Sequence, residues 1–258
     1  MEREHYDLMF RQEARHWWYA GMRRISAALL DRYPPTGCRG QVSPTPDTRH
    51  PTPEILDAGC GSGGMARFLE RRGRVTAIDL AAEAVSLARR RGVRRLLRGS
   101  VGALPLCSER FDLVTSFDVL YHLAVDDDVA ALGELHRVLR PGGILLIRLP
   151  AYDWIRGAHD QAVHTRHRYT RRELRAKLEG VGFRVEHTSY ANFLLFPIAP
   201  AKRLLERRDS SGGVTDLWQP PGPLNRALAA LLALEAPWVS GPSLPWGLSV
   251  FAVGRRIR

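Results

Sequence analysis

The chain has 258 residues, of which 45% are hydrophobic and 25% charged; this suits an ordinary globular protein with room for one large α/β domain. Its formal charge of +11 admits a nucleic-acid or anionic-lipid partner, but every basic residue except Lys177 and Lys202 is an arginine, scattered as a GC-rich coding sequence would also produce. Cys38, Cys60 and Cys107 lie far apart and lack the spacing of zinc ligands or of a disulfide framework, which favours a reducing, cytoplasmic setting. We expect neither a signal peptide nor a transmembrane helix.

Residues 1–33 are predicted to form an N-terminal helical cap. Apolar residues at spacings of three and four predict an amphipathic helix over about 13–32: Trp18, Met22, Ile25 and Leu29. One turn of this helix holds the ring-rich cluster His16-Trp17-Trp18-Tyr19. Two interpretations stay open: one or two of the rings are buried in the core, or rings such as Trp18 and Tyr19 close over a ligand and exclude water.

The segment 34–53 has six prolines and no apolar periodicity, so we predict a linker or surface loop. From residue 54 to about 190, strands alternate with helices, which predicts a core built on a parallel sheet with right-handed crossovers. The predicted strands are 54–58, 74–79, 94–98, 112–117, 143–149 and 183–186. The predicted helices are 63–72, 82–91, 127–139 and 171–180.

The alternation breaks after the sixth strand. Residues 191–245 contain apolar stretches, Gly/Pro punctuation and a long apolar helix from Leu224, and we predict a helical insertion. On the rim of the sheet this insertion would form a lid, an apolar wall for a ligand, or a shallow contact with a membrane surface. Residues 246–258 are predicted to supply the final strand and complete the core.

A glycine turn follows the first predicted strand. Asp57 precedes glycines at 59, 61, 63 and 64, and a helical pattern begins at Met65. A nicotinamide or flavin site would have G-x-G-x-x-G facing a pyrophosphate, which an acid at this position would repel. The spacing and Asp57 instead favour a phosphate-free ligand with an amino group, such as S-adenosylmethionine. Asp79 ends the second strand, where a carboxylate can accept hydrogen bonds from two ribose hydroxyls.

With these residues the chain resembles the class I S-adenosylmethionine-dependent methyltransferases, from about Glu54 to Gly182. Four motifs carry the resemblance: Asp57-Ala-Gly-Cys-Gly-Ser-Gly-Gly64, Ile78-Asp79-Leu80, Ala103-Leu-Pro-Leu106 before Phe111-Asp112-Leu-Val, and Leu139-Arg-Pro-Gly-Gly-Ile-Leu-Leu146. It implies an α/β, three-layer Rossmann-like fold whose seven-stranded sheet has the order 3-2-1-4-5-7-6, with the last strand antiparallel.

The resemblance also implies where the cofactor S-adenosylmethionine binds. One departure concerns the adenine: many members have Asp where this chain has Ser100, and a hydroxyl accepts a hydrogen bond less strongly than a carboxylate. The residues expected to contact the cofactor are Asp57, Gly59, Cys60, Gly61, Asp79, Leu80, Ser100, Val101 and Phe117.

The methyl acceptor is expected beside the ends of strands four and five. Phe117 and Asp118 should lie near the methionine part of the cofactor, while Tyr121 and His122 either face the acceptor or pack against the following helix. Together with Trp18 and Tyr19, we list Tyr121, Tyr152 and Tyr169 as candidate substrate-binding residues.

The loop after strand five is rich in histidine. One of His159, His164 and His167, or His122, could act as a general base. The long spacing of these histidines and the lack of acidic or cysteine partners argue against a metal site. The other interpretation is that Arg168 and Tyr169 are structural and only one histidine contacts the substrate.

Taken together, the sequence predicts a methyltransferase, monomeric or homodimeric, that methylates O, N or C of a small apolar acceptor in bacterial specialised metabolism. The alternatives are a methyltransferase for a lipid-linked or membrane-surface precursor, an RNA methyltransferase, and a non-catalytic cofactor-binding subunit. The RNA alternative lacks a recognisable RNA-binding module or a clustered basic stripe.

Overall fold

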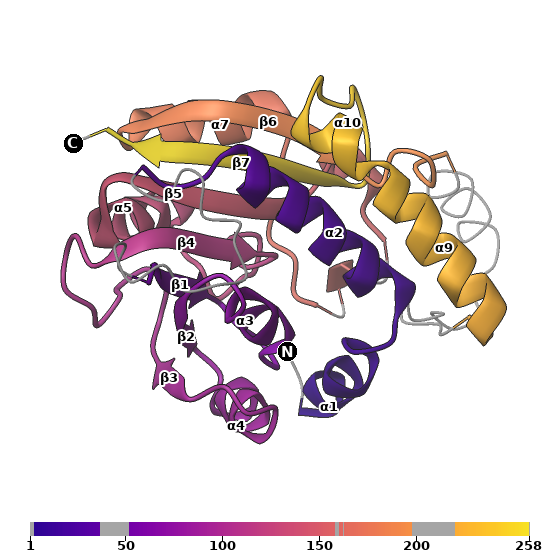
Figure 1. Ribbon diagram of the computed structural model, residues 1–258, viewed down its shortest axis with the longest axis horizontal. Helices are drawn as coiled ribbons and strands as arrows, with labels where there is room; N and C mark the ends of the chain where they lie inside the picture. Colours follow the sequence, from indigo (N-terminus) through magenta and orange to yellow (C-terminus); the bar gives the residue numbers. More distant parts are fainter. Residues whose placement is uncertain (1–2, 37–51, 158–159, 162, 198–219, 258) are drawn as a thin grey trace.

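A computed structural model describes residues 3–36, 52–157, 160–161, 163–197 and 220–257. Its seven-stranded sheet has the order β3-β2-β1-β4-β5-β7-β6, and β7 runs antiparallel to both of its neighbours, as predicted. The strands are β1 (Glu54–Ala58), β2 (Arg74–Asp79), β3 (Arg95–Arg98), β4 (Phe111–Phe117), β5 (Leu139–Pro150), β6 (Phe183–Ala191) and β7 (Ser249–Arg256). Figure 1 shows β3 and β6 at opposite edges of this sheet.

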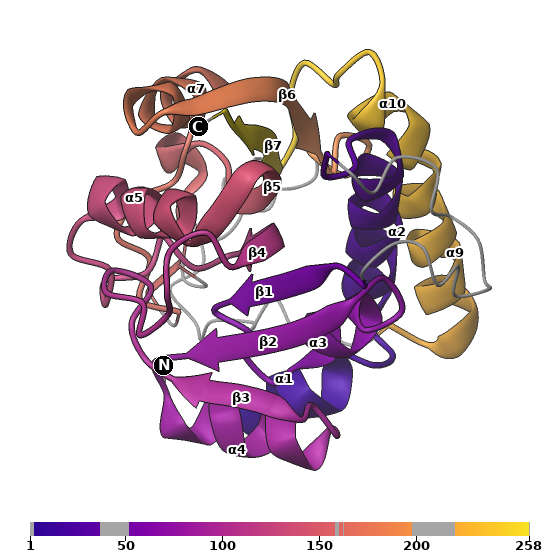
Figure 2. The ribbon, with the colours of Figure 1, turned by 60° about the vertical axis from the view of Figure 1, so that its left-hand side comes forward.

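Helices cover both faces of the sheet, giving three layers. One apolar core packs α5 (Asp128–Val138) and α7 (Arg171–Gly180) against the sheet. The other core, on the opposite face, takes in residues of α2 (Trp17–Arg32), α3 (Gly64–Leu69), α4 (Ala82–Arg90), α9 (Gly222–Leu234) and α10 (Ala236–Ser240). Figure 2 shows α5 and α7 on one side of the molecule and α2, α9 and α10 on the other.

Side-chain caps confirm the predicted starts of two helices. The side chain of Asp127 accepts hydrogen bonds from the backbone N–H groups of Val129 and Ala130, at 2.8 and 3.0 Å. The hydroxyl of Thr170 accepts from the N–H of Glu173 at 3.2 Å. These caps start α5 and α7 close to the positions that the sequence indicated.

The N-terminal helix differs from the single helix predicted over 13–32. The structure has α1 (Arg3–Gln12), a break, and then α2 from Trp17. His16 has an extended backbone (φ −73°, ψ 135°), and its Nδ1 accepts a hydrogen bond from the N–H of Trp18 at 3.3 Å. Because an N-cap residue starts a new helix, the chain turns here and α1 is free to pack elsewhere.

Parts of two predicted segments lie outside the described residues: 37–51 of the 34–53 linker, and 198–219 of the 191–245 insertion. The described remainder of the insertion holds α9 and α10, and α9 packs along α2. Over the part of the chain that the structure describes, no helix is both long and apolar enough to cross a membrane.

Candidate functional site

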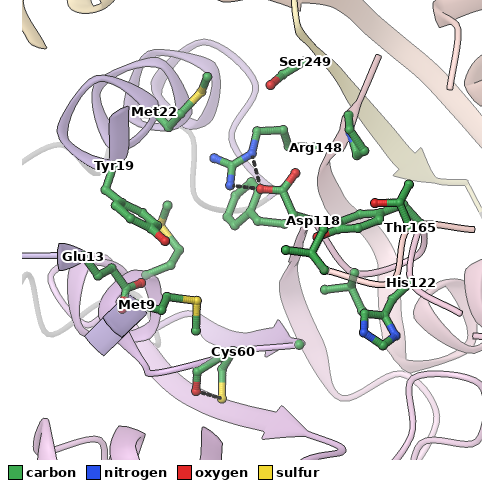
Figure 3. Close-up of a pocket in the computed structure, with 18 of the residues that line it drawn as sticks. Met9, Glu13, Tyr19, Met22, Cys60, Asp118, His122, Arg148, Thr165 and Ser249 are labelled. Carbon is green, nitrogen blue, oxygen red and sulfur yellow. Dashed lines mark hydrogen bonds and ion pairs between the residues drawn. The ribbon is translucent and has the colours of Figure 1, made fainter. Parts of the chain in front are cut away.

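A cavity of about 1040 Å³ lies at the carboxyl ends of β1, β2, β4 and β5, where parallel α/β sheets commonly bind ligands. Residues of α1, α2 and α9 form its other walls, together with the loop that contains η1 (Asp153–Ile155). Figure 3 shows Tyr19 and Met22 on α2 on one side of this space, and Asp118, Arg148 and His122 on the other.

The glycine turn forms one end of the cavity. Gly59, Gly61 and Gly63 all have positive φ, at 81°, 52° and 85°. A Cβ atom at Gly59 would lie 2.1 Å from Cγ2 of Val119, so only glycine fits this position without rearrangement. The N–H of Gly59 donates to the carbonyl oxygen of Ile78 at 2.8 Å, which ties the turn to β2.

Asp57 is the most deeply buried acid of the site, with 2% of its surface exposed. Its Oδ1 accepts a hydrogen bond from the hydroxyl of Thr115 at 2.8 Å, whereas Oδ2 is buried without a partner among the described residues. Burial raises the pKa of Asp57 to about 7, and the negative charges of Glu13 and Asp79 add to the effect. When it is ionised, a buried carboxylate with an unpartnered oxygen is suited to pair with a cationic group of a ligand.

Asp79 stands at the end of β2, beside the glycine turn. Its carboxylate accepts from the N–H groups of Gly61 and Ala81, at 2.9 and 3.0 Å, one bond to each oxygen. Burial raises the pKa of Asp79 as well, while these backbone bonds act against the rise. Each oxygen keeps a further lone pair for a ligand hydroxyl.

The residues predicted to contact the cofactor come together here. All nine line the cavity: Asp57, Gly59, Cys60, Gly61, Asp79, Leu80, Ser100, Val101 and Phe117. The hydroxyl of Ser100 accepts a hydrogen bond from the N–H of Gly102 at 3.1 Å. Cys60 is buried, and burial raises the pKa of its thiol, so it is a neutral wall residue rather than a nucleophile.

An ion pair between Asp118 and Arg148 lies in the cavity wall (Figure 3). Two guanidinium nitrogens of Arg148, Nε and Nη2, donate to the same carboxylate oxygen, Oδ2 of Asp118. The guanidinium also lies over the ring of Trp18, 4.6 Å from its centroid. The sequence interpretation did not include Arg148, although a charged residue inside the apolar run 144–149 is a signal that it serves a purpose.

The four histidines proposed as bases fall at different places. His122 lines the cavity, and its Nδ1 accepts from the N–H of Ala124 at 3.0 Å; burial lowers the pKa of this imidazole. His164 and His167 are not cavity-lining residues: His164 is exposed, and His167 lies between the carboxylates of Asp153 (2.5 Å) and Glu173 (2.9 Å). His159 lies outside the described residues.

Only some of the aromatic residues proposed to bind substrate line the cavity. Trp18, Tyr19 and Tyr121 line the cavity, whereas Tyr152 and Tyr169 do not. Tyr152 stacks on Tyr190, with ring centroids 5.0 Å apart. The buried hydroxyl of Tyr169 donates to the carboxylate of Asp128 at 2.6 Å, which gives it a structural role between the loop and α5.

Glu13 is a cavity residue for which the sequence has no local signal. It lies in the break between α1 and α2, and its carboxylate accepts from the hydroxyl of Ser62 and from the N–H of Gly64 at 3.2 Å. Arg91 pairs with it at 3.2 Å. Glu13 thereby fastens the N-terminal segment to the glycine turn. No group of His, Cys, Asp and Glu suited to hold a metal ion occurs among the described residues.

Comparison with known proteins agrees with this geometry. Residues 56–147 match the protein family described as "Methyltransferase domain". A malonyl-[acyl-carrier protein] O-methyltransferase of Enterobacter lignolyticus is 42% identical over 104 residues, which cover 38% of this chain and 39% of that protein. A probable S-adenosylmethionine-dependent methyltransferase of Mycolicibacterium smegmatis is 35% identical over 140 residues, 52% of this chain and 53% of its own length. The chain thus spans about two fifths to one half of the length of these curated relatives.

Solved structures share the fold over a larger part of the chain. The putative methyltransferase described in complex with the Haloferax volcanii Trm112 methyltransferase activator has a TM-score of 0.59 at 20% identity, covering 98% of both chains. A putative sarcosine dimethylglycine methyltransferase of Galdieria sulphuraria has a TM-score of 0.52 at 16% identity, covering 80% of this chain and 79% of that one. The sheet order, the glycine turn and these matches identify residues 56–147 as a class I S-adenosylmethionine-dependent methyltransferase domain.

Proposed function

We propose that this protein transfers the methyl group of S-adenosylmethionine to a small, largely apolar acceptor. The observation that carries the proposal is the unpartnered, buried Oδ2 of Asp57 in a cavity whose neighbouring acid is Asp79. A ligand with an amino group and ribose hydroxyls satisfies both carboxylates, whereas a pyrophosphate would meet two negative charges.

Individual lining residues are proposed to contact separate parts of the cofactor. Asp57 binds the amino group, Asp79 accepts from the ribose hydroxyls, and the guanidinium of Arg23, which lines the same cavity, is available to the cofactor carboxylate. The glycine turn brings bare backbone to the ligand, and Val101 and Ser100 face the adenine. When bound, S-adenosylmethionine supplies an electrophilic methyl group on a positively charged sulfur. The residues of the protein provide proximity and exclude water, which is most of what methyl transfer requires.

The acceptor is proposed to bind on the side of the cavity away from the glycine turn. Apolar residues dominate there, among them Trp17, Met22, Leu195, Leu228 and Leu248. The malonyl-[acyl-carrier protein] O-methyltransferases make an oxygen acceptor one candidate, beside nitrogen and carbon. The apolar wall supports a specialised metabolite as acceptor, and the dispersed cysteines support a cytoplasmic setting.

One observation favours a second candidate, a lipid-linked acceptor. Leu234, Trp238 and Trp246, in and after α9 and α10, expose 67, 59 and 46% of their surface. Exposed tryptophans next to apolar residues are typical of membrane-surface contacts. Co-sedimentation with anionic liposomes tests this candidate: binding that is lost on Trp238→Ala and Trp246→Ala together would favour it over a freely soluble acceptor.

Calorimetry with S-adenosylhomocysteine, the demethylated product, tests the cofactor site. We expect binding to the wild type and at least a tenfold loss in Asp79→Ala, because two ribose hydrogen bonds to a charged acceptor disappear. The exposed Glu179→Ala is the matched control and should bind normally. Absence of binding, or unchanged binding in Asp79→Ala, would contradict the proposed site.

Incubation of the protein with methyl-labelled S-adenosylmethionine and a metabolite extract tests catalysis. Mass spectrometry of the labelled product then identifies the acceptor. A non-catalytic cofactor-binding subunit would bind S-adenosylhomocysteine and transfer no label, and an RNA methyltransferase would label tRNA instead.

A further inference from the structure

The ion pair at the ends of β4 and β5 is asymmetric. Both hydrogen bonds from Arg148, through Nε at 3.0 Å and through Nη2, reach Oδ2 of Asp118. Among the described residues, none donates to the second carboxylate oxygen, Oδ1. Asp118 adopts a left-handed backbone conformation (φ 56°), and strain of this kind is concentrated at functional sites.

The two partners of the pair are not equally accessible. The side chain of Arg148 is 6% exposed, whereas that of Asp118 is 25% exposed. Aromatic rings cover the guanidinium, whose central carbon lies 4.6 Å from the ring centroid of Trp18 and 5.1 Å from that of Phe117. Both residues line the cavity, but the carboxylate of Asp118 is the more accessible partner of the pair.

Carboxylates outnumber guanidiniums among the residues that line the cavity. Five carboxylates line it: Glu13, Asp57, Asp79, Asp118 and Asp160. Three guanidiniums do so, those of Arg23, Arg148 and Arg168. Arg91 pairs with Glu13 and Arg168 pairs with Asp160, which neutralises two of the five. Asp57 and Asp79 lie at the cofactor end of the cavity, so Asp118 is the carboxylate that remains for the acceptor.

A second hydrogen-bond acceptor of the protein lines the same cavity. Oδ1 of Asn192 is buried without a hydrogen-bond partner among the described residues, and Asn192 is only 4% exposed. Oδ1 of Asp118 and Oδ1 of Asn192 both accept hydrogen bonds, and the hydroxyl of Thr165, another lining group without a partner among the described residues, can donate or accept. A ligand that satisfies Oδ1 of Asp118 and Oδ1 of Asn192 must bring N–H or O–H donors, and a positive charge suits the carboxylate of Asp118.

We infer that the methyl acceptor is an amine and that Asp118 is the catalytic residue that binds its nitrogen. This rests on the proposed methyltransferase function. The bound ammonium first gives one proton to Asp118, which passes it to water. The lone pair freed on the nitrogen then forms the bond to the methyl carbon while the carbon–sulfur bond breaks and leaves its electron pair on sulfur. Positive charge thereby returns to the nitrogen, where the carboxylate of Asp118 stabilises it.

This assignment separates the chain from relatives named for a malonyl substrate. A carboxylate acceptor would approach Oδ1 of Asp118, and two like charges at contact distance repel each other in a cavity of low dielectric constant. Arg148 offers little compensation, because Asp118 and two rings already cover it.

The test compares two probes of similar shape and opposite charge, benzylamine and benzoate, with the protein saturated with S-adenosylhomocysteine. We expect benzylamine to bind at least about tenfold more tightly than benzoate. In Asp118→Asn this preference should disappear or reverse, while the affinity for S-adenosylhomocysteine is unchanged and reports correct folding. Asp112→Asn is the matched control, since Asp112 pairs with Arg140 at the opposite ends of the same two strands, and the preference should persist there.

The outcomes distinguish this inference from the function on which it rests. Failure to bind S-adenosylhomocysteine would overturn both. Normal binding of S-adenosylhomocysteine with benzylamine no tighter than benzoate, or with the preference intact in Asp118→Asn, would overturn the amine assignment alone. The wild-type measurement decides the charge preference even if Asp118→Asn does not fold. An N-methyl product in the labelling experiment supports the assignment, and a methyl ester overturns it.

Discussion

The hydroxyl of Thr115 on β4 donates a hydrogen bond to Oδ1 of Asp57 on β1 at 2.8 Å. The two residues are direct partners in the parallel register of these strands. This bond leaves Oδ2 of Asp57 as the oxygen for a ligand, and it favours the ionised carboxylate, against the larger opposing effect of burial. The balance between these two effects predicts that ligand affinity at this site depends on pH near neutrality.

We predict that affinity for S-adenosylhomocysteine rises with pH between about 5.5 and 7.5. The amino group of this ligand pairs with ionised Asp57, whose pKa is about 7 in the free protein, so binding below pH 7 must first remove a proton. The dissociation constant should fall by nearly tenfold per pH unit at the acidic end and level off above pH 7.5. Calorimetry at a series of pH values measures this.

Thr115→Val should move this pH profile upward and weaken binding at pH 7 by about fivefold to tenfold, because the hydrogen bond that favours ionised Asp57 is lost. Thr115→Ser keeps the hydroxyl and is the matched control. If Thr115→Val binds like the wild type at every pH, the bond has no part in tuning Asp57.

Asp57→Asn should stabilise the ligand-free protein at pH 8. The folded pKa of Asp57, about 7, lies above its unfolded value of 3.8, so the native state holds an extra proton between these values and stability falls as pH rises through this window. A neutral amide escapes this loss, and we expect a gain of about 2 kcal/mol at pH 8 and none below pH 4. Urea unfolding at both pH values measures this, and an equal effect at both would contradict it.

Gly59→Ala should destabilise the protein by about 2–4 kcal/mol and weaken binding of S-adenosylhomocysteine more than tenfold. The φ of 81° is unfavourable for alanine, and its Cβ would overlap Val119. Gly133→Ala in α5 is the control: a Cβ there has no neighbour within 4 Å, and we expect a gain of about 0.5–1 kcal/mol. Thermal unfolding and calorimetry of both variants give the comparison.

Glu13→Ala should loosen the N-terminal segment without unfolding the sheet. The variant loses the bonds to Ser62, Gly64 and Arg91, and we expect faster amide exchange in α1 and about fivefold to tenfold weaker binding of S-adenosylhomocysteine. Arg11→Ala, an exposed change on α1, should leave both properties unaltered. Unaltered exchange of α1 in Glu13→Ala would show that this carboxylate does not anchor the segment.

Tyr169→Phe should lower stability by about 1–2 kcal/mol and leave ligand binding unchanged. Its buried hydroxyl bonds to Asp128, which also pairs with Lys177, so the loss is structural. Urea unfolding measures the stability. A change of more than threefold in the affinity for S-adenosylhomocysteine, or in acceptor turnover, would instead return Tyr169 to the site.

The local sequence by itself predicted the strand–helix alternation and the residues at the cofactor end of the cavity, whereas the sheet order followed from the family resemblance. Asp57 and the glycines are adjacent in a strand–turn–helix unit, and Asp79 ends the next strand, so their geometry follows from connections of a few residues. The apolar periodicity likewise indicated most strands and helices, because each element buries one face on the same sheet.

Only the tertiary structure decided which residues meet at the end of the cavity proposed for the methyl acceptor. Asp118 meets Arg148 because β4 and β5 pair in a register that sets Phe117 beside Arg148, thirty-one positions further along the chain. Glu13 reaches the glycine turn because His16 breaks the helix predicted over 13–32, and Tyr169 and His167 turn toward α5, α7 and η1. Such contacts depend on long-range packing and on where loops fold back, and neither leaves a periodic trace in the sequence.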